Sequence, residues 1–206
     1  MKRKGLLVMG IVVVGIIVLA CYYILLRSGG GFVMLDSFEG RLDHKTVDYG
    51  ASDNSLLEVG ASTDIKICGA QSLKLQYTLE AGGYMWCARG YGLDVLNAVW
   101  EKDFQKVSWD QYNAIGFQMF GNQTGTVAFD LKDAGGELHR YLVQDDFSGW
   151  KEIVIPFSKF KAREDWQPQS ADGNKQLDFP VKSFQWEPKS VGQGVLYFDC
   201  VRLSHI

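Results

Sequence analysis

Short apolar runs alternate with glycine, asparagine and aspartate along the chain after residue 31. No long window there shows the 3.6-residue spacing of apolar positions that an amphipathic helix requires. Short runs separated by turn residues are typical of the strands of a sandwich or jelly roll. The pattern therefore predicts an all-β jelly-roll β-sandwich over residues 32–206, with strands at 32–38, 45–49, 56–59, 72–79, 84–90, 114–120, 126–132, 138–144, 151–156, 183–187 and 195–203.

Two segments interrupt this pattern. Residues 93–109 predict a long loop with a helical turn, and residues 161–176 are too polar to belong to the core. The second segment contains Arg163, Asp165 and Trp166. An indole ring can stack on the C–H face of a sugar, while Arg and Asp offer donors and acceptors for its hydroxyl groups. The segment therefore suggests a sugar-binding loop, although a single Trp more often packs against the core.

The N-terminal region has a different pattern, because residues 5–26 are apolar without a charge, with Lys2, Arg3 and Lys4 before them and Arg27 after them. A stretch of this length can cross a bilayer as one transmembrane helix, and the basic start predicts an exported domain. A cleaved signal peptide has the same basic start, and residues 18–21 resemble a bacterial lipobox that would place a lipid on Cys21. We favour an uncleaved anchor, because the chain stays apolar after Cys21.

The predicted organisation is thus an anchor or signal segment at 1–27, a Gly-rich linker at 28–31 and one β-domain at 32–206. The domain is expected on the extracytoplasmic side of the membrane, in the periplasm or at the cell surface. Four of the 21 basic residues lie in residues 1–27, whereas all 24 acidic residues follow, so the domain is acidic. This balance argues against nucleic acid as a partner. The sequence leaves the oligomeric state open.

Three cysteines, Cys68, Cys87 and Cys200, lie in the predicted exported domain, where disulfides are allowed. An odd number leaves at least one of them unpaired. If residues 72–79 and 84–90 form a hairpin, Cys87 lies far from Cys68 along the strand, which disfavours a bond between these two. The sequence does not fix the pairing.

Catalytic motifs are absent from the sequence. None of the three histidines belongs to an H-E-x-x-H motif, and no G-x-S-x-G elbow occurs. The neighbouring acidic pairs at 145–146 and 164–165 would point to opposite sides of an extended chain. A glycoside hydrolase would need two facing carboxylates roughly 5–10 Å apart, which no motif supports. We therefore predict that the protein is not an enzyme, and that His139 and His205 are structural or solvated.

Aromatic residues are numerous, with six Trp and nine Tyr. Tyr84, Trp86 and Trp166 lie in or beside glycine-rich or polar turns, where a side chain can reach solvent. Trp150 opens a predicted strand and is expected to cover an end of the core, whereas Trp186 could serve the core or a binding surface.

Carboxylates also occur where the domain begins and ends. Glu39 lies in the segment 36–40 and Asp199 in the segment 197–201. If the first and last strands pair, both could share a hard cation with loop carbonyl groups. The alternative is that both are solvated surface carboxylates.

Three segments together resemble the family 11 carbohydrate-binding modules of bacterial β-glucanases, and the likeness covers about residues 33–204. They are Met34-Leu35-Asp36-Ser37-Phe38-Glu39-Gly40, Trp150 to Phe157 with its continuation to Trp166-Gln167-Pro168, and Phe198-Asp199-Cys200-Val201-Arg202-Leu203. The complex I intermediate-associated protein family shares these features more loosely. Either resemblance implies a galactose-binding-like jelly roll.

The family 11 resemblance implies non-catalytic binding of a single β-1,4 or mixed β-1,3-1,4 glucan chain in a cleft on a concave sheet. It implies cleft roles for five residues, which are Tyr49, Tyr84, Arg163, Asp165 and Trp166. It also implies a structural calcium ion at Glu39 and Asp199. The rival expectation, from the second family, is a structural or protein-binding jelly roll.

The sequence departs from the family pattern at three places. Lys182 stands where the family has an acidic cleft residue, and Glu187-Pro188 lies near the position of a cleft tyrosine. Gly135 aligns with an expected aspartate, for which Asp133 would be at best a displaced substitute. These departures leave the identity of the glycan open.

Overall fold

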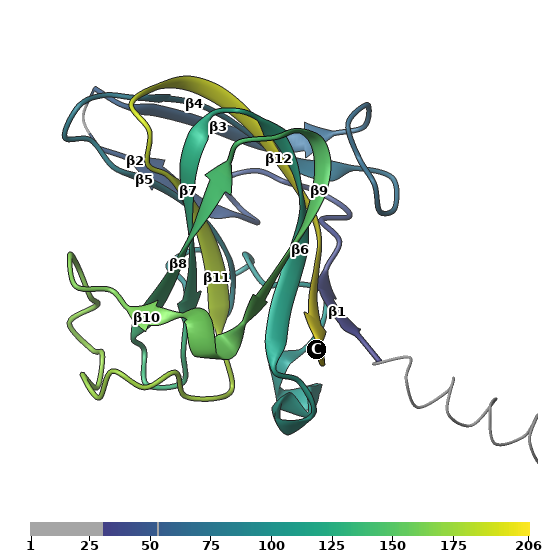
Figure 1. Ribbon diagram of the computed structural model, residues 1–206, viewed down its shortest axis with the longest axis vertical. Coiled ribbons are helices and arrows are strands. Elements are labelled where there is room, and N and C mark those ends of the chain that lie inside the picture. The colour runs from purple at the N-terminus through teal and green to yellow at the C-terminus, as the bar shows by residue number, and fades with distance from the viewer. Residues whose placement is uncertain (1–30, 53) are drawn as a thin grey trace, which may run out of the picture. The chain divides into compact units, whose positions relative to one another are not determined.

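Two antiparallel β-sheets face each other across one hydrophobic core (Figure 1). The structure is a computed structural model that describes residues 31–52 and 54–206, and Phe32–Ile206 form one compact unit. This architecture confirms the all-β sandwich that the short alternating runs predict. Among the described residues, no helix has both the length and the apolar character needed to cross a bilayer. The predicted membrane segment at 5–26, including Cys21, lies outside the described residues.

The first sheet, here called sheet A, places the first and last strands of the domain side by side. β1 pairs with β12 through Val33 opposite Leu203 and Met34 opposite Arg202. The other strands follow in the order β3, β4, β12, β6 and β9. The strands of sheet A are β1 (Val33–Asp36), β3 (Leu56–Ser62), β4 (Ser72–Leu79), β6 (Ala114–Asn122), β9 (Ser148–Pro156) and β12 (Gly192–Ser204).

The second sheet, sheet B, has the order β10, β8, β7, β11, β5 and β2, and all its neighbours are antiparallel. Its strands are β2 (Asp48–Ala51), β5 (Met85–Gly90), β7 (Gly125–Lys132), β8 (Leu138–Asp145), β10 (Lys161–Ala162) and β11 (Ser183–Pro188). β10 adds an edge strand that the sequence pattern did not predict. The short 3-10 helices are η1 (Phe104–Lys106), η2 (Trp109–Gln111) and η3 (Phe157–Lys159).

The two-residue period of β11 assigns its side chains to opposite faces of sheet B. Phe184 and Trp186 are buried in the core, where Trp186 stacks on Phe198 of sheet A with ring centroids 4.3 Å apart. Gln185 and Glu187 therefore point to the other face. This assignment makes Trp186 a core residue, which excludes the alternative that it belongs to a binding surface.

The connection after β4 differs from the predicted hairpin. β4 pairs with β3 and β12 in sheet A, whereas β5 pairs with β2 and β11 in sheet B. The hairpin prediction was therefore wrong, because residues 80–84 turn a corner between the sheets and do not connect two paired strands.

Cys68 forms a disulfide with Cys200, and Cys87 is buried and free. Cys68 thus does not pair with Cys87, although the hairpin on which that expectation rested does not form.

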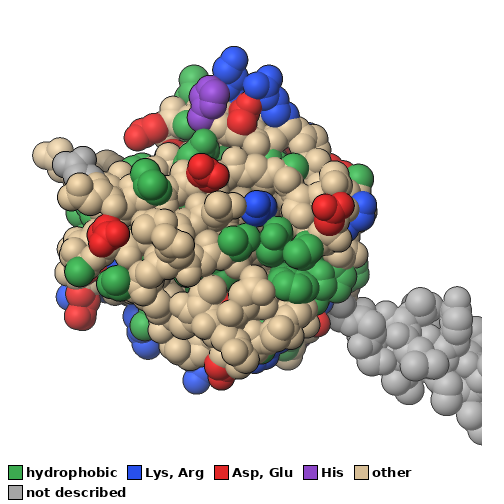
Figure 2. All heavy atoms as spheres, turned by 90° about the horizontal axis from the view of Figure 1, so that it is seen from above, with side chains coloured by type: hydrophobic (Ala, Val, Ile, Leu, Met, Phe, Trp, Pro, Cys, Tyr) green, Lys and Arg blue, Asp and Glu red, His purple; other side chains and the backbone are tan. Residues whose placement is uncertain are grey.

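The face displayed in Figure 2 carries acidic and basic side chains interspersed with hydrophobic ones. His139 is buried, with Nε2 3.2 Å from Oδ2 of Asp133, which is a structural role.

Candidate functional site

A cleft of about 870 Å³ lies over the face of sheet B that points away from the core. Its floor comes from alternate residues of β5 and β11, with Lys132 at the end of β7, and its two rims come from residues around the start of β5 and from the loop after β10. A volume of this size is typical of ligand sites. The cleft brings together four of the five residues that the sequence predicts for the site, which are Tyr84, Arg163, Asp165 and Trp166.

The loop after β10 is fixed to the edge of sheet B. The backbone N–H of Arg163 donates to the carbonyl of Leu138 at 2.8 Å. The Gln167 side chain continues this pairing, because its Oε1 accepts from Leu138 N at 2.7 Å and its Nε2 donates to the carbonyls of Leu138 and Arg163. Trp166 lies between these anchored residues and is 58% exposed, so its ring is held at the cleft with a face open to solvent.

Arg163 links Trp166 to the floor of the cleft. Its guanidinium carbon lies 5.9 Å from the centroid of the Trp166 ring, and its Nη1 donates to Asp130 Oδ2 at 3.0 Å. Its Nε and Nη2 donate to the two oxygens of Asp165. These bonds hold the pKa of Asp165 well below the ordinary carboxyl value, even though partial burial acts in the opposite direction. Asp165 is therefore a fixed, ionised acceptor.

Beneath the cleft lies a second ionic pair that the sequence did not reveal. Asp130 is fully buried and accepts from Arg140 Nε and Nη2 at 2.7 and 2.8 Å and from Gln185 Nε2 at 3.1 Å. Arg140 also pairs with Glu187 on β11. Asp130 and Arg140 occupy facing positions on β7 and β8. The opposite charges of Asp130 and Arg140 could have indicated this ion pair from the sequence. Recognising them as partners, however, requires the register of β7 against β8.

The second rim contains Tyr84, which is 56% exposed. Its backbone is fixed by Ser52, whose N–H donates to the Tyr84 carbonyl at 2.8 Å and whose Oγ accepts from Tyr84 N at 2.9 Å. The Tyr84 ring lies 6.2 Å from that of Trp86, and the two planes are 21° from parallel. This rim therefore presents an aromatic surface to the cleft.

Asp165 and Glu187, two carboxylates of the cleft, suit binding and not proton donation. A glycosidase acid needs a raised pKa so that it can donate a proton near neutral pH. The pKa of Asp165 is instead lowered by Arg163, and Glu187 is paired with Arg140. Exposed rings on two rims above a floor of fixed donors and acceptors form a surface that matches a polar, ring-shaped ligand.

Comparison with known proteins identifies the fold and the family. Residues 27–205 match the carbohydrate binding domain (family 11). The chain belongs to this family. The family 11 resemblance is thus confirmed, and since these modules are non-catalytic carbohydrate-binding domains, residues 27–205 form a non-catalytic domain.

Endoglucanase H of Acetivibrio thermocellus is 31% identical to this family 11 domain over 157 residues, which are 72% of this chain and 15% of the endoglucanase. The chain thus spans only a small part of that relative.

Solved structures establish the jelly-roll fold. The family 11 module of a cellulosomal cellulase from Clostridium thermocellum has a TM-score of 0.67 at 22% identity, covering 86% of this chain and 96% of the module. A Clostridium thermocellum family 11 module in complex with a β-1,3-1,4-mixed-linked tetrasaccharide also has a TM-score of 0.67, at 23% identity, covering 86% and 97%. A family 30 module of the same organism has a TM-score of 0.53 at 12% identity, covering 85% and 98%.

Tyr49 does not lie with the other predicted cleft residues of this family 11 domain. It faces Cys87 in the pairing of β2 with β5, and Cys87 is buried in the core. Residues that face each other across antiparallel strands point to the same side. The Tyr49 ring is accordingly partly buried against the core and is not among the residues that line the cleft.

The three departures from the family pattern have different consequences. Lys182 Nζ donates to the carbonyl of Ala134, and Lys182 does not line the cleft. Asp133 is no substitute for a cleft carboxylate, because it is fully buried and accepts from the backbone N–H groups of Glu137 and Asp178. Glu187, in contrast, does line the cleft, so the late strand contributes a carboxylate there from a different position.

Glu39 and Asp199 bind the loop between β3 and β4 directly. Asp199 Oδ2 accepts from the N–H groups of Ile67 and Cys68, and Glu39 Oε1 accepts from that of Ala70 at 2.7 Å. The Gln71 side chain donates to the carbonyls of Phe38 and Gly40. Calcium takes six to eight oxygen ligands, whereas the oxygens here are largely occupied by N–H donors. The geometry of these residues does not fit a calcium ion, and the predicted ion stays untested.

Proposed function

We propose that the cleft binds a single chain of β-1,4 or mixed β-1,3-1,4 glucan without cleaving it. Sugar rings would stack on Trp166 and Tyr84, and their hydroxyl groups would bond to Arg163 and Asp165. The observation that carries this proposal is that these four side chains, which come from two distant parts of the sequence, line one open cleft. A scattered arrangement would have favoured a protein-interaction domain.

The charges of the cleft favour a neutral polysaccharide. Arg163 is paired with Asp165, and Arg140 is paired with Asp130 and Glu187. Such paired groups can still accept hydrogen bonds from a hydroxyl group or donate N–H bonds to it. They leave little net charge for binding an acidic sugar. The mixed-linked tetrasaccharide bound by a family 11 module of Clostridium thermocellum supports the glucan class.

The proposal includes a membrane tether. Residues 5–26 would hold the domain at the extracytoplasmic side of a membrane, either as an uncleaved helix or through a lipid on Cys21. Fractionation of cells that express the full chain tests this part. Release of the protein from membranes by alkaline carbonate would contradict it, and a Cys21→Ala variant separates the two modes, because only a lipid-anchored protein would lose the membrane.

Affinity electrophoresis of the full chain tests the glucan proposal. The native gels contain barley β-glucan, hydroxyethyl cellulose, xylan or no polysaccharide, and a nonionic detergent without a sugar headgroup keeps the chain soluble. We expect retardation in one or both glucan gels and free migration in xylan. Free migration in every gel would contradict the proposal and favour a protein-interaction jelly roll of the complex I intermediate-associated type.

A further inference from the structure

Trp86 lies in the cleft, where the sequence pattern expects its side chain to reach solvent but the family resemblance assigns it no role. It lines the cleft from β5 and is partly exposed. Tyr84 directly precedes β5, two positions before Trp86, and the two rings are nearly parallel. Trp86 therefore extends the aromatic rim that Tyr84 begins.

The Trp86 ring is held in place by two contacts. It lies across Gly50, its partner on β2, where a Cβ atom would come within 2.7 Å of Cζ2 and closer still to Cη2. Its Nε1 donates to Asp48 Oδ1 at 3.1 Å, and Asp48 Oδ2 accepts from Asp94 N at 3.1 Å. A glycine within a strand often marks such a close approach. The ring is thus fixed before any ligand arrives, which lowers the ordering cost of binding.

The fixed indole has a restricted chemistry. Because Asp48 takes its only N–H donor, the group that Trp86 has left to offer a ligand is the face of its ring. A ring face attracts the C–H face of a sugar. The Trp166 rim lies beyond β10, at the opposite edge of the sheet, and four strand-to-strand steps of about 4.8 Å separate β10 from β5. A ligand that reaches both rims must therefore contain several sugar units.

We propose that Trp86 is a third stacking residue of the cleft and that Gly50 and Asp48 are the residues that position it. This inference rests on the proposed glucan-binding function. Tyr84 and Trp86 together form one platform for consecutive sugar units, and Trp166 holds the chain at the other rim. The affinity then depends on the placement of the Trp86 ring as well as on its presence.

Three variants distinguish the effect of the Trp86 ring on affinity from the effect of its position. Trp86→Ala removes the ring, and we expect it to weaken binding of a glucan hexasaccharide by at least about tenfold, as for other aromatic anchors. Trp86→Phe keeps a ring and should retain most of the affinity. Gly50→Ala adds only a methyl group under the end of the ring, which can swing away, so the fold should persist while the affinity falls. All variants are measured as the full chain in detergent by isothermal titration calorimetry.

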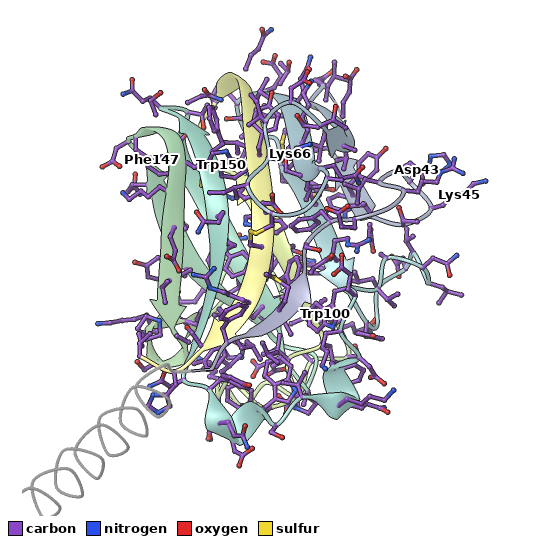
Figure 3. All side chains as sticks on the ribbon, turned by 90° about the vertical axis from the view of Figure 1, so that its right-hand side faces the viewer. Asp43, Lys45, Lys66, Trp100, Phe147 and Trp150 are labelled. Atoms are coloured by element: carbon purple, nitrogen blue, oxygen red, sulfur yellow. A yellow bond between two sulfur atoms is a disulfide. The ribbon has the colours of Figure 1, made fainter. Side chains whose placement is uncertain are left out.

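The NMR chemical shifts of the six Trp indole N–H groups distinguish a ligand contact from a structural role. A Trp that only supports the fold should keep its chemical shift when the ligand is added. On titration of the ¹⁵N-labelled full chain with the hexasaccharide, the Trp86 signal, assigned from Trp86→Phe, should shift and saturate together with that of Trp166. The signal of Trp150, which lies on sheet A (Figure 3), should stay fixed. If Trp166 shifts while Trp86 does not, and Trp86→Ala binds like the parent, the Trp86 inference is wrong but the function stands. If the parent shows no binding, the proposed function itself fails.

Discussion

Arg163 donates to both oxygens of Asp165, at 2.9 Å in each bond, although only two positions separate the residues in the sequence. Two parallel charge-assisted bonds fix the orientation of both groups. The cleft thereby obtains an acceptor whose position and charge do not depend on the ligand. Arg140 supports the same carboxylate through Nη1, which lies 3.4 Å from Oδ2.

This pair predicts that glucan affinity is insensitive to mild acid. A carboxyl group with a lowered pKa stays ionised above that value, and its contacts are lost only when the pH falls through the lowered pKa. We expect a constant affinity from neutral pH down to about pH 4.5, near the ordinary carboxyl range. Titration calorimetry at several pH values checks this. A loss of affinity already complete at that pH would contradict the assignment of Asp165.

The buried Asp130 should be important for stability. It accepts hydrogen bonds from both Arg140 and Arg163. Its removal takes a buried carboxylate partner away from two guanidinium groups. Breaking a buried ion pair from one side costs about 3 kcal/mol or more. We expect Asp130→Ala to lower the free energy of unfolding by that amount in urea denaturation. The exposed Asp110→Ala is the control, and equal midpoints for the two variants would refute the buried network.

Tyr49 and Tyr84 should respond differently to substitution. Tyr49 faces the core side of sheet B, so a folded Tyr49→Leu variant, which removes the ring but keeps an apolar side chain, should leave glucan affinity unchanged. Tyr84→Ala removes an exposed ring from the rim of the cleft and should weaken binding by about 1–3 kcal/mol. Calorimetry on both variants decides between the placement in the structure and the role that the family resemblance implies for Tyr49.

The disulfide between Cys68 and Cys200 should stabilise the domain. It lies beside Glu39 and Asp199, the residues at which the resemblance implies a calcium ion. Cys68 and Cys200 are 132 residues apart in the sequence, and a crosslink that closes such a long loop typically contributes about 2–5 kcal/mol. We expect the double variant Cys68→Ser/Cys200→Ser to lose this amount in chemical denaturation. EDTA or added calcium should leave the Tm of the parent unchanged. A Tm that rises with calcium would show that Glu39 and Asp199 rearrange to bind the ion.

Much of the fold could be predicted because its signals are local. Alternation between apolar and polar residues, with glycine turns, places all eleven predicted strands within a few residues of those observed. Arg163, Asp165 and Trp166 were found because they are close together in one polar loop. The predicted hairpin failed because a turn that links two strands of one sheet and a corner that links two sheets have similar sequences.

The remaining features of the site depend on register, which the sequence does not display. A shift of one position moves a strand residue to the opposite face, which separates Tyr49 from the cleft. The pairing of Asp130 with Arg140, and the position of Trp86 over Gly50, both require knowing which residues face each other on neighbouring strands. The bond between Cys68 and Cys200 likewise depends on a loop meeting the last strand.

The central claim is that the cleft on sheet B binds a glucan chain. Its most direct test is titration calorimetry of the parent, Trp166→Ala and the control Trp150→Ala, as folded full chains, with a mixed-linked β-1,3-1,4 glucan oligosaccharide. Trp150 is an aromatic residue of sheet A, outside the cleft. We predict that the parent and Trp150→Ala bind with equal affinity and that Trp166→Ala loses about 1–3 kcal/mol. Equal binding by all three proteins would contradict the account, as would binding by none.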